Sequence, residues 1–228
     1  MSSRKEELVE EKETGRVEAF SDGVFGVAIT LLIFTIQVPH PESGKSLLSQ
    51  LGQQWPSYLA YVTSFMTILI MWLNHHAIFR LISRTDQLFM LLNGLLLLVI
   101  TFVSFPTALL ADYLGTQDER TAALLYSATG IVLAILYNAL WLYASHDGRL
   151  LSKKADLAVV HTITHQYRFG PLFYLLAFVL AFVSVLASVG LNLALAIFFA
   201  FTGTSRAIQT HGRVEAKKAA RIGKGASP

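Results

Sequence analysis

The stretch AFSDGVFGVAITLLIFTIQV, from Ala19 to Val38, is apolar for nearly its whole length and ends directly before Pro39. An α-helix needs about 20 such residues to cross the hydrocarbon core of a bilayer. The segment before it is rich in Glu and Lys, unlike the basic start of a signal peptide, and the stretch has no small-residue cleavage site. We therefore expect it to be a first transmembrane helix that the protein retains.

The rest of the chain has the same character. Of its 228 residues, 54% are hydrophobic and only 14% are charged, and the mean hydropathy of +0.52 is far from that of a soluble domain. These features predict an all-α fold, a polytopic membrane protein with six transmembrane helices in one bundle. We expect the last two to form a tight helical hairpin around Ser188, Gly190 and Asn192. The further apolar runs are Tyr58–Phe79, Leu88–Ala111, Ala122–Tyr143, Pro171–Val189 and Leu191–Phe201.

The basic residues predict the orientation of these helices, because Lys and Arg near the ends of spans are retained on the cytoplasmic side. All but two of the 18 Lys and Arg residues lie in segments that six spans place on one side, the exceptions being Lys45 and Arg120. We therefore expect both termini in the cytoplasm of a multi-pass plasma-membrane protein. Residues 1–17 form a cytoplasmic segment in this scheme, 18–210 the six-helix domain, and 211–228 a disordered basic tail.

Several classes of function are disfavoured by what the sequence lacks. It contains no cysteine, which removes disulfides and thiolate metal sites. Its net charge of +3 comes from residues that flank apolar runs, not from a basic stripe with interleaved aromatics, so we expect no nucleic-acid partner. His161 and His165 have helical metal-ligand spacing but no further ligand nearby, and Asp22 has no second intramembrane carboxylate. We expect neither an enzyme, nor a metal site, nor a bound cofactor.

Polar residues inside the predicted spans are candidates for function, because burying them in hydrocarbon is costly. Ser21 and Asp22 lie near the start of the first span, Trp72 and His75 near the end of the second, and Asn93 near the start of the third. These positions share one membrane depth, because odd spans start and even spans end on the cytoplasmic side. Hydrogen bonds that hold three helices together are the simpler interpretation, and proton or cation handling by Asp22 and His75 is the alternative.

Two basic regions are candidates for contact with lipid. The segment Leu150–Tyr167 mixes apolar residues with Lys153 and Lys154, which favours a helix lying on the inner membrane surface. The tail from Arg213 to Lys224 is a candidate for binding anionic lipid, although topology alone accounts for its charge.

The same residues resemble those of a known family. The chain is similar to prokaryotic members of the transmembrane protein 175 family, the endosomal and lysosomal potassium channels, whose hallmark is a Phe-Ser-Asp motif in the first helix. The resemblance covers the first half of the chain and extends to the second half only in topology and hydropathy. It rests on Arg16, Phe20, Ser21, Asp22, Gly23, Val24, Phe25, Trp72, His75, Phe79, Leu91, Leu92, Asn93, Ile100, Thr101, Phe102 and Pro106.

The resemblance implies a potassium-permeable channel, assembled as a homotetramer whose four first helices line a central pore. It also implies that Arg16 and Phe20 join Ser21, Asp22, Trp72, His75 and Asn93 in one helix-locking network. Because no TVGYG-type filter is present, the resemblance assigns the constriction to an apolar stripe on the first helix. The matching positions are Val27, Leu31 and Phe34, with Thr30 beside them, and Phe34 departs from the aliphatic residue expected there.

Other interpretations stay open beside this one. Without the resemblance, the apolar stripe would pack in the core or face lipid. A secondary transporter would use Asp22 and His75 as a proton-coupled site, although the two halves of the chain share no repeated motif. A non-conducting membrane scaffold would use the polar residues for assembly alone.

Overall fold

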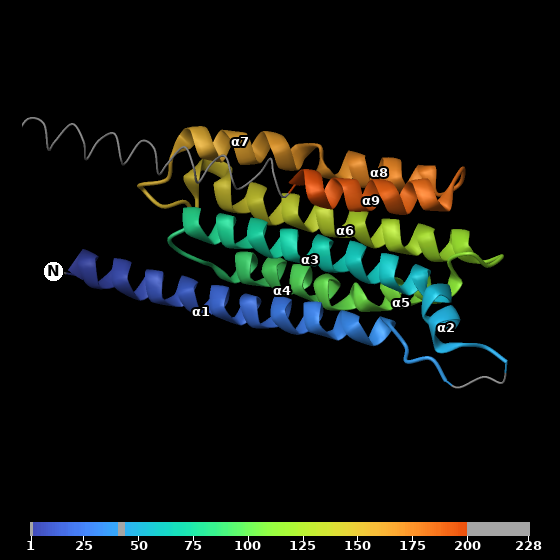
Figure 1. Ribbon diagram of the computed structural model, residues 1–228. Coiled ribbons are helices and arrows are strands. Elements are labelled where there is room, and N and C mark those ends of the chain that lie inside the picture. Colours follow the sequence, from blue (N-terminus) through green and yellow to red (C-terminus); the bar gives the residue numbers. More distant parts are fainter. Residues whose placement is uncertain (1, 41–43, 200–228) are drawn as a thin grey trace, which may run out of the picture.

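The computed structural model describes residues 2–40 and 44–199. Every named element in these residues is a helix, and one isolated bridge joins Ile82 to Leu151. The helices lie side by side in an elongated bundle (Figure 1), as the predicted all-α fold requires. Their bounds are α1 (Ser2–Leu31), η1 (Leu32–Thr35), α2 (Leu47–Gln53), α3 (Trp55–Leu81), α4 (Gln87–Phe102), α5 (Ser104–Tyr113), α6 (Glu119–Ser145), η2 (His146–Gly148), α7 (Leu157–Arg168), α8 (Gly170–Leu180) and α9 (Val185–Phe199).

Four helical segments are long and apolar enough to cross a membrane, and they correspond to the first four predicted spans. The third is interrupted where α4 gives way to α5, next to Pro106, whose ring nitrogen has no proton to donate to the carbonyl of Phe102. The protein is therefore a multi-pass helical membrane protein. The four segments are Glu13–Thr35, Trp55–Leu81, Gln87–Tyr113 and Glu119–Gly148.

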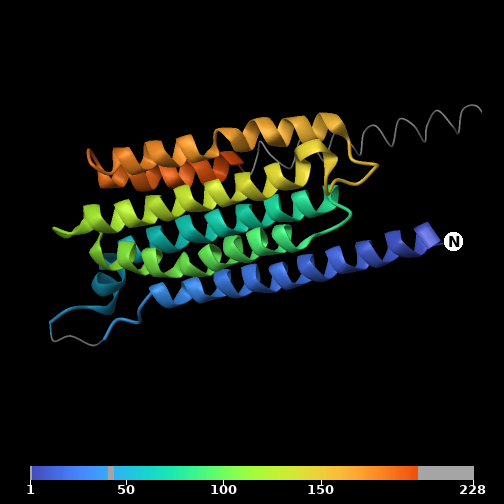
Figure 2. The same cartoon turned by 180° about the vertical axis from the view of Figure 1, so that it is seen from behind.

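Helix α1 lies at the edge of the bundle, against α3 and α4 (Figures 1 and 2). Phe25, Ala28 and Leu32 recur at helical spacing on its inner face and are buried in the main core, which α3, α4 and α6 complete. Within a bilayer these side chains hold α1 mainly by close van der Waals packing, because lipid tails are as apolar as the side chains themselves. The remaining faces of α1 are largely exposed in the single chain.

The region around the fifth predicted span differs from expectation. Helices α7 and α8 follow one another along α6, so Leu157–Tyr167 does not lie across the end of the bundle as an inner-surface helix would (Figures 1 and 2). Pro171 cannot donate to the Tyr167 carbonyl, and the Asn138 side chain on α6 donates to that oxygen instead, at 2.6 Å. Lys153 and Lys154 had favoured an interfacial helix over Leu150–Tyr167, but both precede α7, and Ile163 and Tyr167 are buried in the bundle.

The predicted position of the final hairpin is also wrong. The chain turns between α8 and α9 at residues 181–184, whereas Ser188, Gly190 and Asn192 lie inside α9. Ser188 and Asn192 are buried because they bond other helices: the Ser188 hydroxyl donates to the Ala177 carbonyl at 2.7 Å, and the Asn192 amide donates to Ser127 Oγ at 3.1 Å. The end of the sixth predicted span and the predicted tail, residues 211–228, lie outside the described residues.

Candidate functional site: a polar network between three helices

The buried polar residues of α1, α3 and α4 form a chain of hydrogen bonds. Asn93 on α4 donates its amide N–H to Ser21 Oγ on α1 at 2.9 Å, and Ser21 donates to the Val17 carbonyl at 2.8 Å. The Asn93 oxygen lies 2.8 Å from His75 Nε2 on α3. An amide oxygen can only accept, so Nε2 donates this hydrogen bond. Asn93 thus connects all three helices.

A second set of contacts joins α1 to α3 beside this chain. Trp72 Nε1 donates to Asp22 Oδ1 at 2.8 Å. One helical turn away on both helices, His76 Nδ1 lies 2.9 Å from Glu18 Oε1, and the Trp72 and His76 rings stack at 6.3 Å. Asp22 and Glu18 on α1 therefore each contact an aromatic side chain of α3. Glu18 and His76 are absent from the sequence-based network, although the shared spacing of four residues could have revealed them.

His75 is held in a site that limits its chemistry. Its side chain is fully buried, its ring stacks on Phe79 at 4.5 Å, and the Phe25 ring lies at 5.3 Å on a tilted plane. Within the described residues, Nδ1 has no hydrogen-bond partner. His75 is thus held by aromatic packing and by the hydrogen bond at Nε2.

Two of the predicted network residues stand apart. Arg16 and Phe20 are both exposed on α1, Phe20 with 68% of its surface accessible, and neither contacts the hydrogen-bonded residues through a polar group. They line a groove between α1 and α4 that also includes Gly94 and Leu97. In the single chain, the network therefore consists of Ser21, Asp22, Trp72, His75 and Asn93, with Glu18 and His76 added. We call these seven residues the polar network.

The four predicted constriction residues lie on the outward face of α1 and η1. Val27, Leu31 and Phe34 are 54%, 43% and 77% exposed, and Thr30 is exposed as well. The Thr30 hydroxyl donates to the Val27 carbonyl at 2.9 Å, which leaves oxygen lone pairs directed outward. None of the four packs in the core, so the apolar stripe can contact lipid or another subunit.

Metal ligands do not gather in the parts of the chain that the structure describes. No three His, Asp or Glu side chains there converge on one point. His161 and His165 are both exposed on α7, and His165 contacts the ring of Phe169.

This multi-pass helical bundle is similar in sequence to known proteins. Residues 16–104 match the sequence profile of the endosomal/lysosomal potassium channel TMEM175. A protein of Chamaesiphon minutus named a potassium channel is 54% identical over 196 residues, which cover 85% of this chain and 97% of that protein. A Streptomyces collinus protein, also named a potassium channel, is 43% identical over 190 residues, 83% of this chain and 92% of that protein.

The fold agrees with these similarities. The crystal structure of a lysosomal potassium-selective channel TMEM175 homolog from Chamaesiphon minutus superposes with a TM-score of 0.79 at 50% identity, and the match covers 85% of this chain and all of that one. The human endosomal/lysosomal proton channel TMEM175 is 33% identical over 135 residues, only 27% of its length. The chain belongs to the TMEM175 family, a family of ion channels and not of enzymes.

Proposed function

We propose that this protein is a potassium-permeable channel of the plasma membrane, a homotetramer in which four copies of α1 surround a central pore. The observation that carries this proposal is the 54% identity to a named potassium channel along 97% of that protein. The chain is similar over the whole membrane domain and not only at the Phe-Ser-Asp motif, which makes a shared activity the simplest conclusion.

The proposed topology has six spans with both termini in the cytoplasm. In this topology the end-to-end pair α7 and α8 would supply the fifth span, and α9 would begin the sixth. The distribution of Lys and Arg supports this orientation, because only Lys45 and Arg120 fall on the outer side of such a scheme.

The outward stripe of α1 supports the proposed pore. Val27, Leu31 and Phe34 are apolar, exposed and aligned on one face, so in a tetramer they would meet around the central axis. An apolar ring raises the cost of passing a partly dehydrated cation. K⁺ sheds water more readily than Na⁺, so such a ring would favour K⁺ without carbonyl ligands, and Thr30 would offer the side-chain oxygens at that level.

The polar network is proposed to hold α1 in place while ions pass along its other face. Its buried members Ser21, His75 and Asn93 form hydrogen bonds with one another, and the His75 side chain is inaccessible to solvent. Glu18 and Asp22 bond donors on α3 and do not face the apolar stripe. These contacts favour a structural role over direct ion or proton handling.

A flux assay with the purified full chain in proteoliposomes tests the proposal. We expect passive K⁺ flux, driven by a gradient alone and larger than Na⁺ flux under matched conditions. Flux that requires exchange of a second substrate would indicate a transporter, and silence in all ion gradients would indicate a scaffold. A proton gradient belongs in the same series, because the animal relatives are named proton channels.

A further inference from the structure

The connections between α3 and α4 and between α6 and α7 are joined into one unit. Ile82 and Leu151 form an antiparallel bridge. The Ser83 N–H donates to the Leu150 carbonyl at 3.0 Å, and the Ser152 N–H donates to the Leu81 carbonyl at 2.8 Å. Backbone hydrogen bonds of this kind restrict both loops, so the side chains that they carry have defined positions relative to one another.

Two arginines are fixed by this unit. Arg84 donates from Nε to the Arg149 carbonyl at 2.8 Å, and the Arg149 guanidinium lies 4.9 Å from the centre of the Tyr143 ring. Each contact immobilises a side chain but leaves terminal N–H groups available, because a guanidinium has five N–H donors. Within the described residues, neither arginine forms an ion pair with a carboxylate. Lys153 and Lys154 follow in the same connection and are exposed. We call these four residues the basic platform.

Two of the three acidic residues nearby are engaged by helix N–H groups. Asp86 accepts from the Phe89 N–H at 2.9 Å and from the Tyr143 hydroxyl at 2.6 Å, and Asp156 accepts from the Ala158 N–H at 2.8 Å. Asp147 is exposed, 3.5 Å from the neighbouring His146. The four basic residues of the platform are exposed as well and outnumber these three carboxylates.

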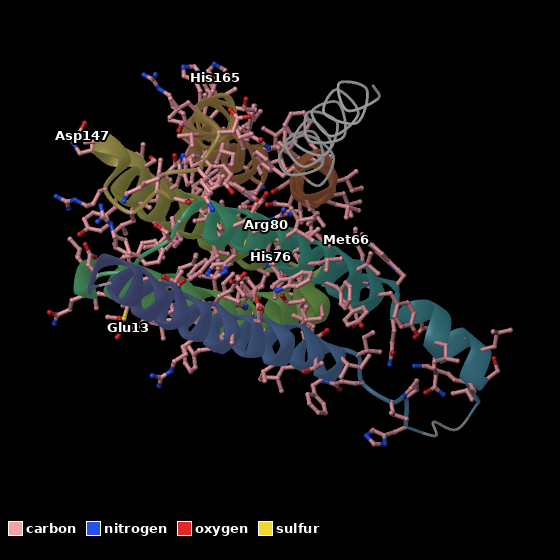
Figure 3. All side chains as sticks on the ribbon, turned by 90° about the vertical axis from the view of Figure 1, so that its left-hand side faces the viewer. Glu13, Met66, His76, Arg80, Asp147 and His165 are labelled. Atoms are coloured by element: carbon pink, nitrogen blue, oxygen red, sulfur yellow. The ribbon has the colours of Figure 1, made fainter. Side chains whose placement is uncertain are left out.

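The position of the basic platform indicates which part of the membrane it contacts. It lies directly beyond the ends of the membrane segments Trp55–Leu81 and Glu119–Gly148 and before Gln87–Tyr113. Figure 3 looks at this end of the bundle, with Arg80 at the end of α3 and Asp147 between α6 and α7. Lipid headgroups occupy this level of a bilayer, and phosphate is the group that a fixed guanidinium pair recognises best.

We propose that the basic platform binds the phosphate of an anionic phospholipid headgroup, with Arg84 and Arg149 as its principal donors. Because Tyr143 and the Arg149 carbonyl hold the two guanidinium groups before the lipid arrives, little side-chain freedom is lost on binding. The site is separate from the apolar stripe of α1 and does not depend on ion conduction.

The test compares lipid affinity of the purified full chain with that of matched variants. Phosphatidylglycerol is titrated into protein in neutral detergent, and binding is followed by native mass spectrometry and by the rise in the thermal unfolding midpoint. Phosphatidylcholine serves as the neutral lipid. We expect Arg84→Gln and Arg149→Gln each to weaken phosphatidylglycerol binding about fivefold, corresponding to about 1 kcal/mol per basic residue. Gln retains an amide donor for the backbone contact of Arg84.

The control variants Lys45→Gln and Arg120→Gln remove the same charge at the opposite end of the bundle and should leave the affinity unchanged. If the Lys45 and Arg120 variants lose as much phosphatidylglycerol affinity as the Arg84 and Arg149 variants, the attraction is nonspecific and the proposal is overturned. Inorganic phosphate is the competitor, and displacement of the lipid by phosphate at similar concentration would identify a site for a free anion instead. If the Gln variants do not fold, Arg84→Lys and Arg149→Lys keep the charge but lose the paired donors. Wild-type affinity in both Lys variants would also overturn the proposal.

Discussion

Trp72 Nε1 donates to Asp22 Oδ1 across the interface of α1 and α3, at 2.8 Å. The bond attaches an otherwise peripheral helix, α1, to the centre of the bundle. It also places a carboxylate beside the fully buried His75 without a hydrogen bond between the two. Asp22 is therefore an anchor for α1 in the first instance, and its effect on conduction should follow from that.

Substitution of Asp22 should reduce stability before it alters conduction. Asp22→Ala leaves the Trp72 indole without an acceptor, at a cost of about 1–3 kcal/mol, whereas Asp22→Asn retains a side-chain oxygen and should lose less. The measurement is the unfolding midpoint and the oligomer fraction in mild detergent. An Asp22→Ala protein that assembles normally but conducts no ions would assign the carboxylate to the ion pathway.

Asn93 should be the most sensitive member of the polar network, because it connects two helices to its own. Asn93→Leu removes partners from both Ser21 and His75, and leaving two buried groups unpaired should cost about 2–6 kcal/mol in total. Ser21→Ala removes one bond and should cost less. A double-mutant cycle between these positions measures the coupling, and strictly additive effects would contradict a connected network.

The outward stripe should control permeation without affecting folding. Leu31→Ala and Val27→Ala widen the proposed constriction, so conductance should rise and discrimination of K⁺ from Na⁺ should fall. Thr30→Ala should alter selectivity if its hydroxyl contacts ions. The selectivity of each variant is measured as the reversal potential with K⁺ on one side of the membrane and Na⁺ on the other. If neither Val27→Ala nor Leu31→Ala changes the reversal potential, α1 does not line the ion pathway.

The matched control for that series is Ile33→Ala. Ile33 is half-exposed but lies off the line of the stripe, so its truncation should leave selectivity unchanged. Ile29 is unsuitable as a control, because its side chain packs against the main core.

Asn138 is the side chain that joins α6 to the break between α7 and α8. Asn138→Leu should remove its hydrogen bond to the Tyr167 carbonyl, which also accepts from the Phe169 N–H, and should lower stability by about 0.5–1.5 kcal/mol. Asn138→Gln keeps the amide and is the conservative comparison. Thermal unfolding in detergent measures both, and a fully stable Leu variant would show that this hydrogen bond does not stabilise the break.

Acid stability should depend in part on Asp86, at the start of α4. Desolvation raises its pKa, but hydrogen bonds from Tyr143 and Phe89 and the charge of Arg149 outweigh this and lower the pKa below its ordinary value. A depressed pKa contributes stability above the ordinary value of about 4, and this stability is lost as pH falls toward the folded pKa. Asp86→Asn can still cap the helix but does not titrate. Its unfolding midpoint should therefore vary less with pH in the acidic range, and identical pH profiles would contradict the assignment.

The sequence predicted the depth of the polar network but not its pairing. Span order alone places Ser21, His75 and Asn93 at one level, and the structure brings them into contact. Which side chains meet depends on the rotation of each helix about its axis, which hydropathy does not encode. For this reason the sequence missed the pairing of Glu18 with His76. Arg16 and Phe20 entered the predicted network through the family resemblance alone, and both are exposed in the single chain.

The second half of the chain was harder to predict for a different reason. Buried polar residues such as Ser188 and Asn192 resemble a turn when only composition is considered, because their partners lie on other helices. The mixed polarity of α7 likewise resembles an interfacial helix, although one face of it is covered by α6. In both places, tertiary contacts overrode the local pattern.

The single buried face of α1 separates two kinds of constraint along one helix. Side chains such as Phe25 and Leu32 pack in the interior of the chain. Val27 and Phe34 are exposed, so they make their contacts outside the single chain. Variation at the inner positions is limited by folding of each subunit. In the proposed tetramer, variation at the outer positions would be free to tune permeation while the subunits keep the same architecture.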